Sequence, residues 1–292
     1  MRNFRGFTLI ELLVVISIIV LLIGILFPFI GSIRDNSRLT LCANNQRQIG
    51  VGFVAYSGEY KDAVTYATMI NGQSISALGT YTFDELLAKY TGHEGLSPKI
   101  MKTTYVPLEL SNPLFICPDD DQSDRGPGSD HKAPRSYSML QGKQQPGKSL
   151  ADGMGVFYGR RSGKMYEPAN IRFGSPDIPD PSQAGMMTDA SFTTSNASGN
   201  HQGDYYAAQL ESASSQVPGG RLSYYQFKAT KGHVFGGEYV RNYLLADGHV
   251  TNMTPLQSSG GNHLKEESEI DQILKTPEGI WTRTTRDSRA NK

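Results

Sequence analysis

The chain has 292 residues and a formal net charge of zero, because 28 lysines and arginines balance 28 aspartates and glutamates. Without a basic excess there is no electrostatic reason to expect nucleic-acid binding, and we expect no nucleic-acid partner. The 31 glycines, 15 prolines and 15 tyrosines are typical of a turn-rich, aromatic protein with a tendency to form β-structure.

A short basic leader, residues 1–6, precedes a long apolar segment, residues 7–30. An apolar run of about 20 residues is long enough to cross a bilayer as a helix. Glu11 lies at the start of this run, where a carboxylate costs roughly 2.5 kcal/mol or more and therefore requires a specific reason. The positive charges of the leader, Arg2 and Arg5, favour the cytoplasm, so the rest of the chain is expected outside it.

The motif Gly6-Phe7-Thr8-Leu9-Ile10-Glu11 resembles the cleavage and methylation motif of type IV prepilins and type II secretion pseudopilins. The resemblance implies that a prepilin peptidase cuts between Gly6 and Phe7 and methylates the new amino terminus. Glu11 would then be the fifth residue of the mature chain. Many pilin helices also carry a proline, as Pro28 does here. The implied partners are the peptidase, other pilin-like subunits, an assembly platform of a secretion or pilus system, and the membrane.

This segment has three other possible interpretations. A secretory signal has an apolar core of roughly 7–15 residues and a small-residue cleavage site, whereas this core is longer and no Ala-x-Ala site follows it. A plain signal anchor fits the length but does not explain Glu11. Thr8 and Glu11 also have the spacing of a capping box, in which Glu11 serves its own helix end. The capping role is compatible with the pilin-like interpretation.

Residues 31–60 continue the helical pattern as an amphipathic segment. A continuous helix from residue 7 to residue 60 would be about 80 Å long, and Pro28 is expected to kink or locally melt it. The apolar residues of the second half recur at helical spacing and define one face: Cys42, Ile49, Phe53, Tyr56 and Tyr60.

Residues 61–257 are expected to form a β-rich head, and residues 258–292 a charged tail with one surface helix at 266–275. A capping box at Thr82 and Glu85 predicts a helix that Gly92 closes. Asp247-Gly248 predicts a hairpin turn. Extended segments are predicted at 101–110, 113–116, 153–158, 170–173, 185–188, 224–228, 233–235 and 239–246. The expected fold class is α+β: a long N-terminal helix, transmembrane and then amphipathic, followed by a mainly antiparallel β-sheet head with long loops.

The head also resembles the C-terminal domain with a processing-associated His-x9-Asp-Gly motif that many prepilin-like proteins carry. The matching elements are Cys42-Ala-Asn-Asn, Cys117-Pro-Asp-Asp, Ser136-Tyr137 and Ala246-Asp-Gly-His-Val. Thirteen residues, 234–246, separate His233 from Asp247, instead of nine. Either the hairpin is longer in this chain, or His233 is not the equivalent histidine.

Two groups of residues could ligate metals. His233, Asp247 and His249 are possible transition-metal ligands. Their irregular spacing, however, favours a structural role in which a histidine hydrogen-bonds the turn at Asp247-Gly248. An acidic loop could bind Ca²⁺ through its carboxylates, although its spacing matches no EF-hand and a solvated loop is the favoured interpretation. Its residues are Asp119, Asp120, Asp121, Asp124 and Asp130. No obligatory cofactor is expected.

Cys42 and Cys117 are the two cysteines of the chain. An even number of cysteines in a domain outside the cytoplasm favours a disulfide. A bridge closing a loop of about 75 residues would stabilise the fold by roughly 4 kcal/mol in the chain-entropy model. The alternative is two buried free thiols.

Common enzyme motifs are missing from the sequence, including His-Glu-x-x-His, Gly-x-Ser-x-Gly, a phosphate loop and Cys-x-x-Cys. We therefore predict a non-enzymatic filament subunit, which crosses the inner membrane once before assembly and places its head in the periplasm or at the cell surface. The alternative is a membrane-anchored extracytoplasmic binding protein or enzyme that uses the pilin-type segment for targeting.

The first testable prediction concerns processing. The mature chain should begin at Phe7 and carry an N-methyl group, because the cleavage motif places the cut after Gly6. Intact-mass analysis and N-terminal sequencing of the envelope protein check this, and retention of Met1 would contradict it. Gly6→Ala should be tolerated, whereas a bulky side chain in Gly6→Phe should block cleavage.

Overall fold

A computed structural model of the chain describes residues 8–66, 68–70, 80–94, 108–119, 136–140, 154, 157–161, 164–166, 171–176, 178–189, 207–211, 221–223, 233–235 and 238–258. The predicted tail helix at 266–275 and the predicted strand at 224–228 lie outside these residues. The cleavage site and most of the acidic loop also lie outside them.

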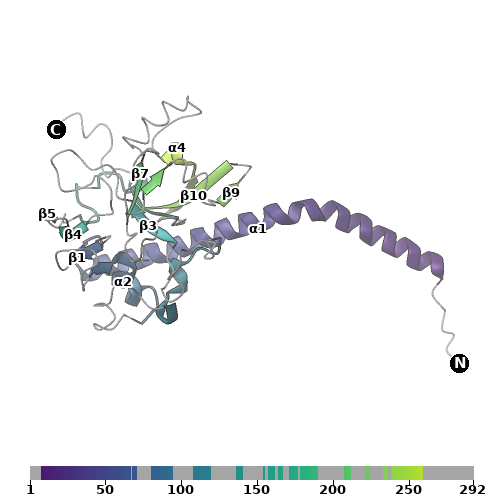
Figure 1. The fold of residues 1–292 in the computed structure, drawn as a ribbon, viewed down its shortest axis with the longest axis horizontal. Coiled ribbons are helices and arrows are strands. Elements are labelled where there is room, and N and C mark those ends of the chain that lie inside the picture. The colour runs from purple at the N-terminus through teal and green to yellow at the C-terminus, as the bar shows by residue number, and fades with distance from the viewer. Residues whose placement is uncertain are drawn as a thin grey trace.

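One long helix, α1 (Leu9–Glu59), dominates the molecule. Its 51 residues correspond to about 77 Å at 1.5 Å per residue. Its N-terminal half projects away from the head, whereas its C-terminal half lies within the head (Figure 1). The helix is continuous through Pro28, so the proline does not melt it, and the ribbon is bowed rather than straight (Figure 1). A single lost backbone donor bends a long helix more readily than it ends one.

The predicted amphipathic face of α1 is buried in the head. Cys42, Ile49, Phe53 and Tyr56 are all at most 8% exposed. Tyr60, in contrast, is 47% exposed, so its predicted place on the buried face is wrong. The helix ends at Glu59 and the chain then turns away, although the Tyr60 ring still stacks on Tyr56 at a centroid distance of 4.4 Å.

The larger sheet has seven strands in the described part of the chain, with the order β11-β10-β6-β3-β7-β8 and β9 paired to β10. The pairs β11–β10, β10–β6, β6–β3 and β9–β10 are antiparallel, and β3–β7 and β7–β8 are parallel. Every residue of β3 and β6 is buried, as expected of central strands covered on both faces. The strands are β3 (Tyr137–Leu140), β6 (Gly185–Asp189), β7 (Ala207–Glu211), β8 (Arg221–Ser223), β9 (His233–Phe235), β10 (Glu238–Leu245) and β11 (Val250–Met253).

A smaller four-stranded sheet has the order β2-β1-β4-β5, with β1 and β4 parallel and the other pairs antiparallel. Its strands are β1 (Thr68–Ile70), β2 (Thr80–Thr82), β4 (Phe157–Arg161) and β5 (Lys164–Tyr166). Antiparallel pairs outnumber parallel pairs in the two sheets together. The predicted fold class, a long helix followed by a mainly antiparallel head, is therefore confirmed.

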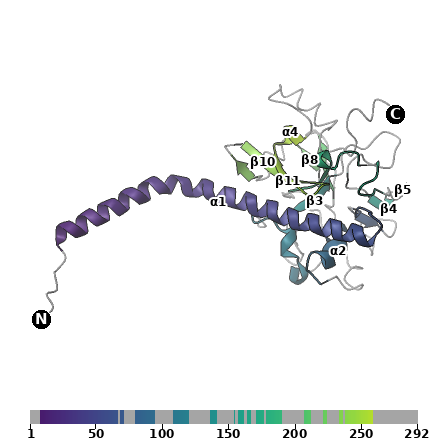
Figure 2. The ribbon, with the colours of Figure 1, turned by 180° about the vertical axis from the view of Figure 1, so that it is seen from behind.

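The predicted capped helix is present as α2 (Phe83–Leu87), continued by the 3-10 turn η1 (Ala88–Tyr90). Thr82 and Glu85 form the predicted capping box, and Gly92 follows with a φ of +76°, which favours glycine. In Figures 1 and 2 the C-terminal half of α1 lies between α2 and the strands of the larger sheet. Phe83 packs α2 against α1, because its ring centroid is 6.4 Å from that of Phe53, and the same ring is 5.9 Å from Phe115.

Several predicted extended segments take other forms. The segments at 108–110 and 113–116 contain the 3-10 turns η2 (Leu108–Leu110) and η3 (Pro113–Phe115). Pro113 suits the first position of such a turn, and the Asn112 side chain caps it by accepting from the Leu114 amide. The segment at 170–173 contributes one isolated bridge to Ala63. Strands β2, β3, β5, β7 and β8 lack a clear sequence signal and were missed. The 3-10 turn η5 (Pro181–Gln183) and the short helix α4 (Pro255–Ser258) complete the described elements.

Two glycines of α1 allow a direct test of the packing between α1 and η1. A Cβ atom at Gly52 would stand 2.8 Å from the Thr91 methyl group, and the Thr91 hydroxyl is fixed by the Leu87 and Ala88 carbonyls. Nothing lies within 4 Å of a Cβ at Gly58. We expect Gly52→Ala to lower the free energy of unfolding of the head, and Gly58→Ala to leave it unchanged or raise it by up to about 1 kcal/mol through helix propensity. Urea unfolding followed by circular dichroism measures both, and a Gly52→Ala head as stable as Gly58→Ala would contradict the described packing.

Candidate functional site

The amino end of α1 is closed by a complete capping box. The Thr8 backbone amide and hydroxyl each donate to the Glu11 carboxylate at 2.8 Å, and the Glu11 amide donates to the Thr8 hydroxyl at 3.2 Å. Both side chains are exposed. The carboxylate thus has local donors, as the capping interpretation predicts, and it also remains accessible to a further partner. Gly6 and Phe7 lie outside the described residues.

The first part of α1 is a candidate membrane span. Residues Leu9–Phe27 are long and apolar enough to cross a bilayer, and none of this stretch is buried inside the protein. No other helix in the described residues meets this test of length and composition. The apolar side chains therefore have no partner within the described head. Together with the motif at its start, this helix indicates a membrane anchor.

A second group of functional interest lies inside the head, where α1 meets the segment after η3. Cys42 and Cys117 form a disulfide there, with a Cα–Cα distance of 5.3 Å. Cys42 is completely buried and Cys117 is 5% exposed. The predicted bridge is present, and it fixes the segment after η3 to the long helix.

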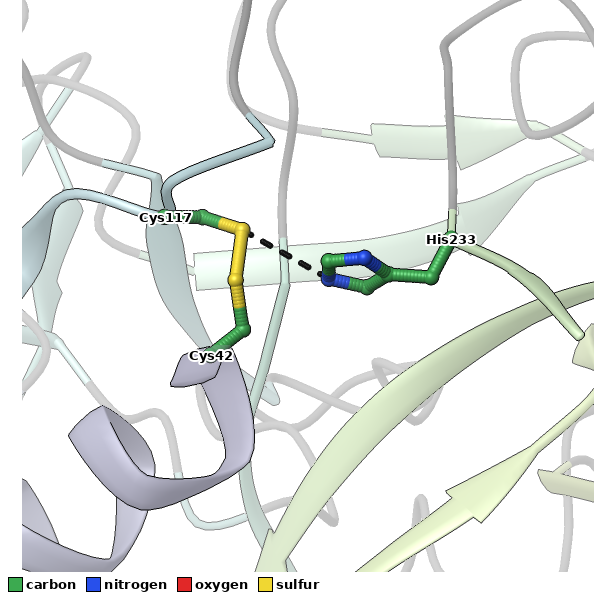
Figure 3. Close-up of side chains that lie close together, drawn as sticks. All are labelled: Cys42, Cys117 and His233. Carbon is green, nitrogen blue, oxygen red and sulfur yellow. Dashed lines mark hydrogen bonds between the residues drawn. A yellow bond between two sulfur atoms is a disulfide. The ribbon is translucent and has the colours of Figure 1, made fainter. Parts of the chain in front are cut away.

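His233, the first residue of β9, points at this disulfide (Figure 3). Its Nε2 atom is 3.5 Å from the Cys117 Sγ atom and 3.4 Å from the Asp189 Oδ2 atom. Its Nδ1 atom is 3.3 Å from the Asp119 Oδ2 atom. The imidazole is 3% exposed, so each ring nitrogen faces a carboxylate in a site with almost no access to solvent.

The two carboxylates are themselves held in place. Asp189, at the end of β6, accepts hydrogen bonds from the Gln46 side chain at 2.7 Å and from the backbone amide of Asn242 at 2.9 Å. The buried Arg241 guanidinium donates to the Asp189 backbone carbonyl. Asp119 forms an ion pair with Arg38 of α1 at 2.9 Å. Residues from α1 and β10 thus hold the two carboxylates, from β6 and from the segment after η3, that flank His233 of β9.

This arrangement shifts two pKa values. Burial lowers the pKa of His233, but the contacts with Asp119 and Asp189 outweigh burial and raise it to about 9. Burial likewise raises the pKa of Asp119, but the contacts with His233 and Arg38 outweigh it and the net direction is downward. We conclude that the imidazole is a cation at neutral pH and that two carboxylates compensate its charge.

The structure corrects the possible metal group of His233, Asp247 and His249. His233 pairs with Val240 at the start of β10, whereas Asp247 lies beyond the other end of that strand, about 20 Å further along. Asp247 and His249 contact each other instead, with 2.7 Å between Oδ2 and Nδ1 on an exposed turn. The Leu245 amide donates to the His249 carbonyl and Gly248 has a φ of +90°. The predicted hairpin is therefore present with a three-residue loop.

The acidic loop is placed only in part. Asp119 forms ion pairs with Arg38 and His233, so its carboxylate is already engaged within the head. Asp120, Asp121 and Asp124 lie outside the described residues, so the calcium hypothesis stays a prediction.

Sequence reasoning missed four residues of the buried site: Gln46, Asp189, Arg241 and Asn242. Gln46 was hidden among the polar residues of α1, yet it is fully buried. Asp189 and Arg241 stand within or at the end of apolar strand sequences. A charged residue inside a strand that is otherwise buried usually has a partner, and that signal could have identified both.

Comparison with known protein families places the amino-terminal segment alone. Residues 1–27 match the family described as the prokaryotic N-terminal methylation motif. This segment is a small part of the chain, and the head carries no match to that family. No curated protein and no solved structure gave a significant match. The match supports a type IV pilin-like precursor, processed by a prepilin peptidase and anchored through its apolar helix.

The charge on His233 leads to a prediction for how the stability of the head depends on pH. Its pKa is about 9 in the folded chain and about 6.5 in an unfolded one. A raised folded pKa contributes stability that is complete below about pH 6.5 and is lost as the pH rises through about 9. We expect the free energy of unfolding to fall by about 3 kcal/mol over this range.

Urea unfolding at a series of pH values from 6 to 10, in approximate steps of one unit, checks this expectation. His233→Gln should lose most of the pH dependence in that window. His249→Gln, a change on the exposed turn, should retain it. An equal pH dependence in the wild type and His233→Gln would contradict the assignment to the buried imidazole.

Proposed function

We propose that this protein is a non-enzymatic, pilin-like structural subunit that assembles into an envelope filament of a type II secretion or type IV pilus-like system. The observation that carries the proposal is the combination of the methylation motif with an apolar half-helix that the head leaves uncovered. Such a surface is stable in a membrane before assembly. In a filament, the same surface can pack against the helices of other subunits.

Glu11 gives the proposed assembly its register. Cleavage after Gly6 creates a positive ammonium group at Phe7, which must enter the low-dielectric bundle of helices. A buried charge is tolerated when it has a partner of opposite sign. The Glu11 carboxylate of a neighbouring subunit can supply that partner, because it is exposed at the tip of α1. Each subunit would therefore pair with the next at one fixed position.

The proposal places the head outside the cytoplasm. The disulfide between Cys42 and Cys117 supports this side of the membrane, because disulfides persist in oxidising compartments. The basic leader, which favours the cytoplasmic side, supports the same orientation. The buried His233 site is enclosed and fully engaged with the head, which fits a structural role better than turnover of a substrate.

The test is the substitution Glu11→Leu. Membrane insertion and cleavage after Gly6 should survive, because the segment becomes more apolar and the cut lies outside the altered position. Filament assembly should fail, because the Phe7 ammonium loses its partner. Processing is verified by intact mass, and filaments sheared from cells are then examined for the head by immunoblotting and electron microscopy.

Two further variants separate charge pairing from other effects. Glu11→Gln keeps a side chain that can complete the capping box but removes the charge, so it should also fail to assemble. Ser17→Leu alters an exposed residue of the same apolar segment, whose hydroxyl donates to the Leu13 carbonyl of its own helix, and should assemble normally. Normal filaments from Glu11→Leu would refute the mechanism. An absence of filaments from the wild type would favour the anchored binding protein or enzyme.

A further inference from the structure

We propose that the reduced head binds one thiophilic divalent cation of the Zn²⁺ type through Cys42, Cys117, His233 and Asp189, at the place where the oxidised head has its disulfide. This site is independent of filament assembly. It rests on the donor atoms around the disulfide. Figure 3 shows three of these residues, Cys42 of α1, Cys117 after η3 and His233 of β9, and Asp189 at the end of β6 is the fourth.

The donor atoms are already close together. One ligand atom from each of Cys42, Cys117 and His233 lies within 4.8 Å of the other two, and all three residues are buried. Two sulfurs and one imidazole nitrogen are preferred ligands of Zn²⁺, and a carboxylate oxygen is a common addition. Asp189 offers such an oxygen, because its Oδ2 atom lies 3.4 Å from the His233 Nε2 atom.

Two of the ligand-to-ligand distances, both measured from His233 Nε2, match tetrahedral coordination. With Zn–S near 2.3 Å and Zn–N and Zn–O near 2.1 Å, two ligands of one ion are separated by about 3.5 Å for sulfur and nitrogen and about 3.4 Å for nitrogen and oxygen. The observed distances from His233 Nε2 are 3.5 Å to Cys117 Sγ and 3.4 Å to Asp189 Oδ2. Bonded sulfurs stand about 2.0 Å apart, so metal binding requires the two sulfurs to separate to about 3.8 Å.

The neighbouring residues are suited to support such a site. A zinc-binding histidine commonly donates its second ring nitrogen to a carboxylate, which fixes the tautomer and the ring orientation. His233 Nδ1 faces Asp119 at 3.3 Å, and this leaves Nε2 for the metal. Gln46 and the Asn242 amide orient Asp189. Asp119, Gln46 and Asn242 would therefore act as positioning residues.

The charges also balance. Two thiolates and one carboxylate carry one negative charge more than a divalent cation neutralises. The buried Arg241 guanidinium, which contacts the Asp189 backbone, supplies the compensating positive charge. In the oxidised head the thiolates are absent and the His233 imidazolium is the cation between the carboxylates. Asp119 and Asp189 thus compensate the protonated imidazole in the oxidised head. In the reduced head Asp189 would bind the metal ion and Asp119 would orient His233.

The two states exchange by defined chemistry. A dithiol supplies two electrons and two protons, so that the Cys42–Cys117 bond becomes two thiols while the dithiol forms its own disulfide. Metal binding then releases the two thiol protons and the Nε2 proton to solvent. In the reverse direction an external disulfide accepts the two electrons, takes up two protons and becomes a dithiol, while the Cys42–Cys117 bond re-forms and the ion is released. The metal would therefore occupy the site in a chain whose cysteines have not yet been bridged.

The experiment uses the full chain in detergent and Co²⁺ as the spectroscopic probe. The oxidised chain, which should show no reactive thiols after denaturation, is expected to bind no Co²⁺. A phosphine is the reductant: together with water it converts the disulfide to two thiols and itself becomes the phosphine oxide. It is chosen because it does not compete for the metal as a thiol would. The reduced chain should bind one Co²⁺ with a thiolate-to-metal absorption band in the near ultraviolet, and one equivalent of Zn²⁺ should displace it.

Three variants of the reduced chain locate the site. His233→Gln should weaken Co²⁺ binding by more than about 10-fold, and Asp119→Asn should weaken it by about 10- to 100-fold, the usual effect of losing a carboxylate that orients a ligand. His249→Gln, on the exposed turn, should bind as the wild type does. Equal affinity of the wild type and His233→Gln would overturn the proposal, as would binding to the oxidised chain.

Circular dichroism of the same samples shows whether the head unfolds when the disulfide is reduced. In that case the proposal expects Zn²⁺ to restore the far-ultraviolet spectrum of the wild type and of His249→Gln, but not of His233→Gln. A reduced head that stays folded and binds no Co²⁺ overturns the proposal, and so does an unfolded one that Zn²⁺ does not restore.

Discussion

Burial of one face of α1 against β9 and β10 is the constraint on which the rest of the head depends. The same turns of helix that pack Ile49 and Phe53 into the core also carry Cys42 to Cys117 and Gln46 to Asp189. The Asn242 side chain of β10 donates to the Leu39 carbonyl of α1, which adds a polar contact at the entry of the helix into the head. Apolar area, a covalent bond and buried hydrogen bonds thus fix one register of the helix against the sheet. A rotation of α1 about its axis would break all three together.

The two halves of α1 follow from two different surroundings. The first half has apolar side chains on every face and no contact with the described head, so its stability depends on a membrane or on other helices. The second half has one apolar face and is stabilised by packing within the head. Because one continuous helix joins the halves, a position fixed at the membrane is transmitted mechanically to the head. This coupling suits a subunit whose helix is held in a bundle while its head lies at the surface.

The buried histidine shows how a polar centre is accommodated in such a head. A cationic imidazole next to a disulfide would be unstable without compensation, and the carboxylates of Asp119 and Asp189 provide it. Their contacts outweigh burial and raise the pKa of His233. Each carboxylate in turn meets a group from α1, Arg38 or Gln46, so the electrostatics and the packing of the long helix stabilise each other.

The sequence alone determined the features that depend on neighbouring residues: the motif from Gly6 to Glu11, the length of α1, the capped helix at Thr82 and the turn at Gly248. Each of these is set by periodicity, capping or backbone conformation within a few residues. The tertiary structure alone decided that His233 meets Asp119 and Asp189 rather than Asp247 and His249. Strand pairing through β10 brings Asp189 to His233, and the disulfide to α1 fixes the segment that carries Asp119. The tertiary structure also decided where strand β3 lies, since a strand buried on both faces has no alternation to mark it. Caps, turns and helix length can be predicted from residues that are close in sequence, whereas the position of a buried charge depends on which distant segments fold around it.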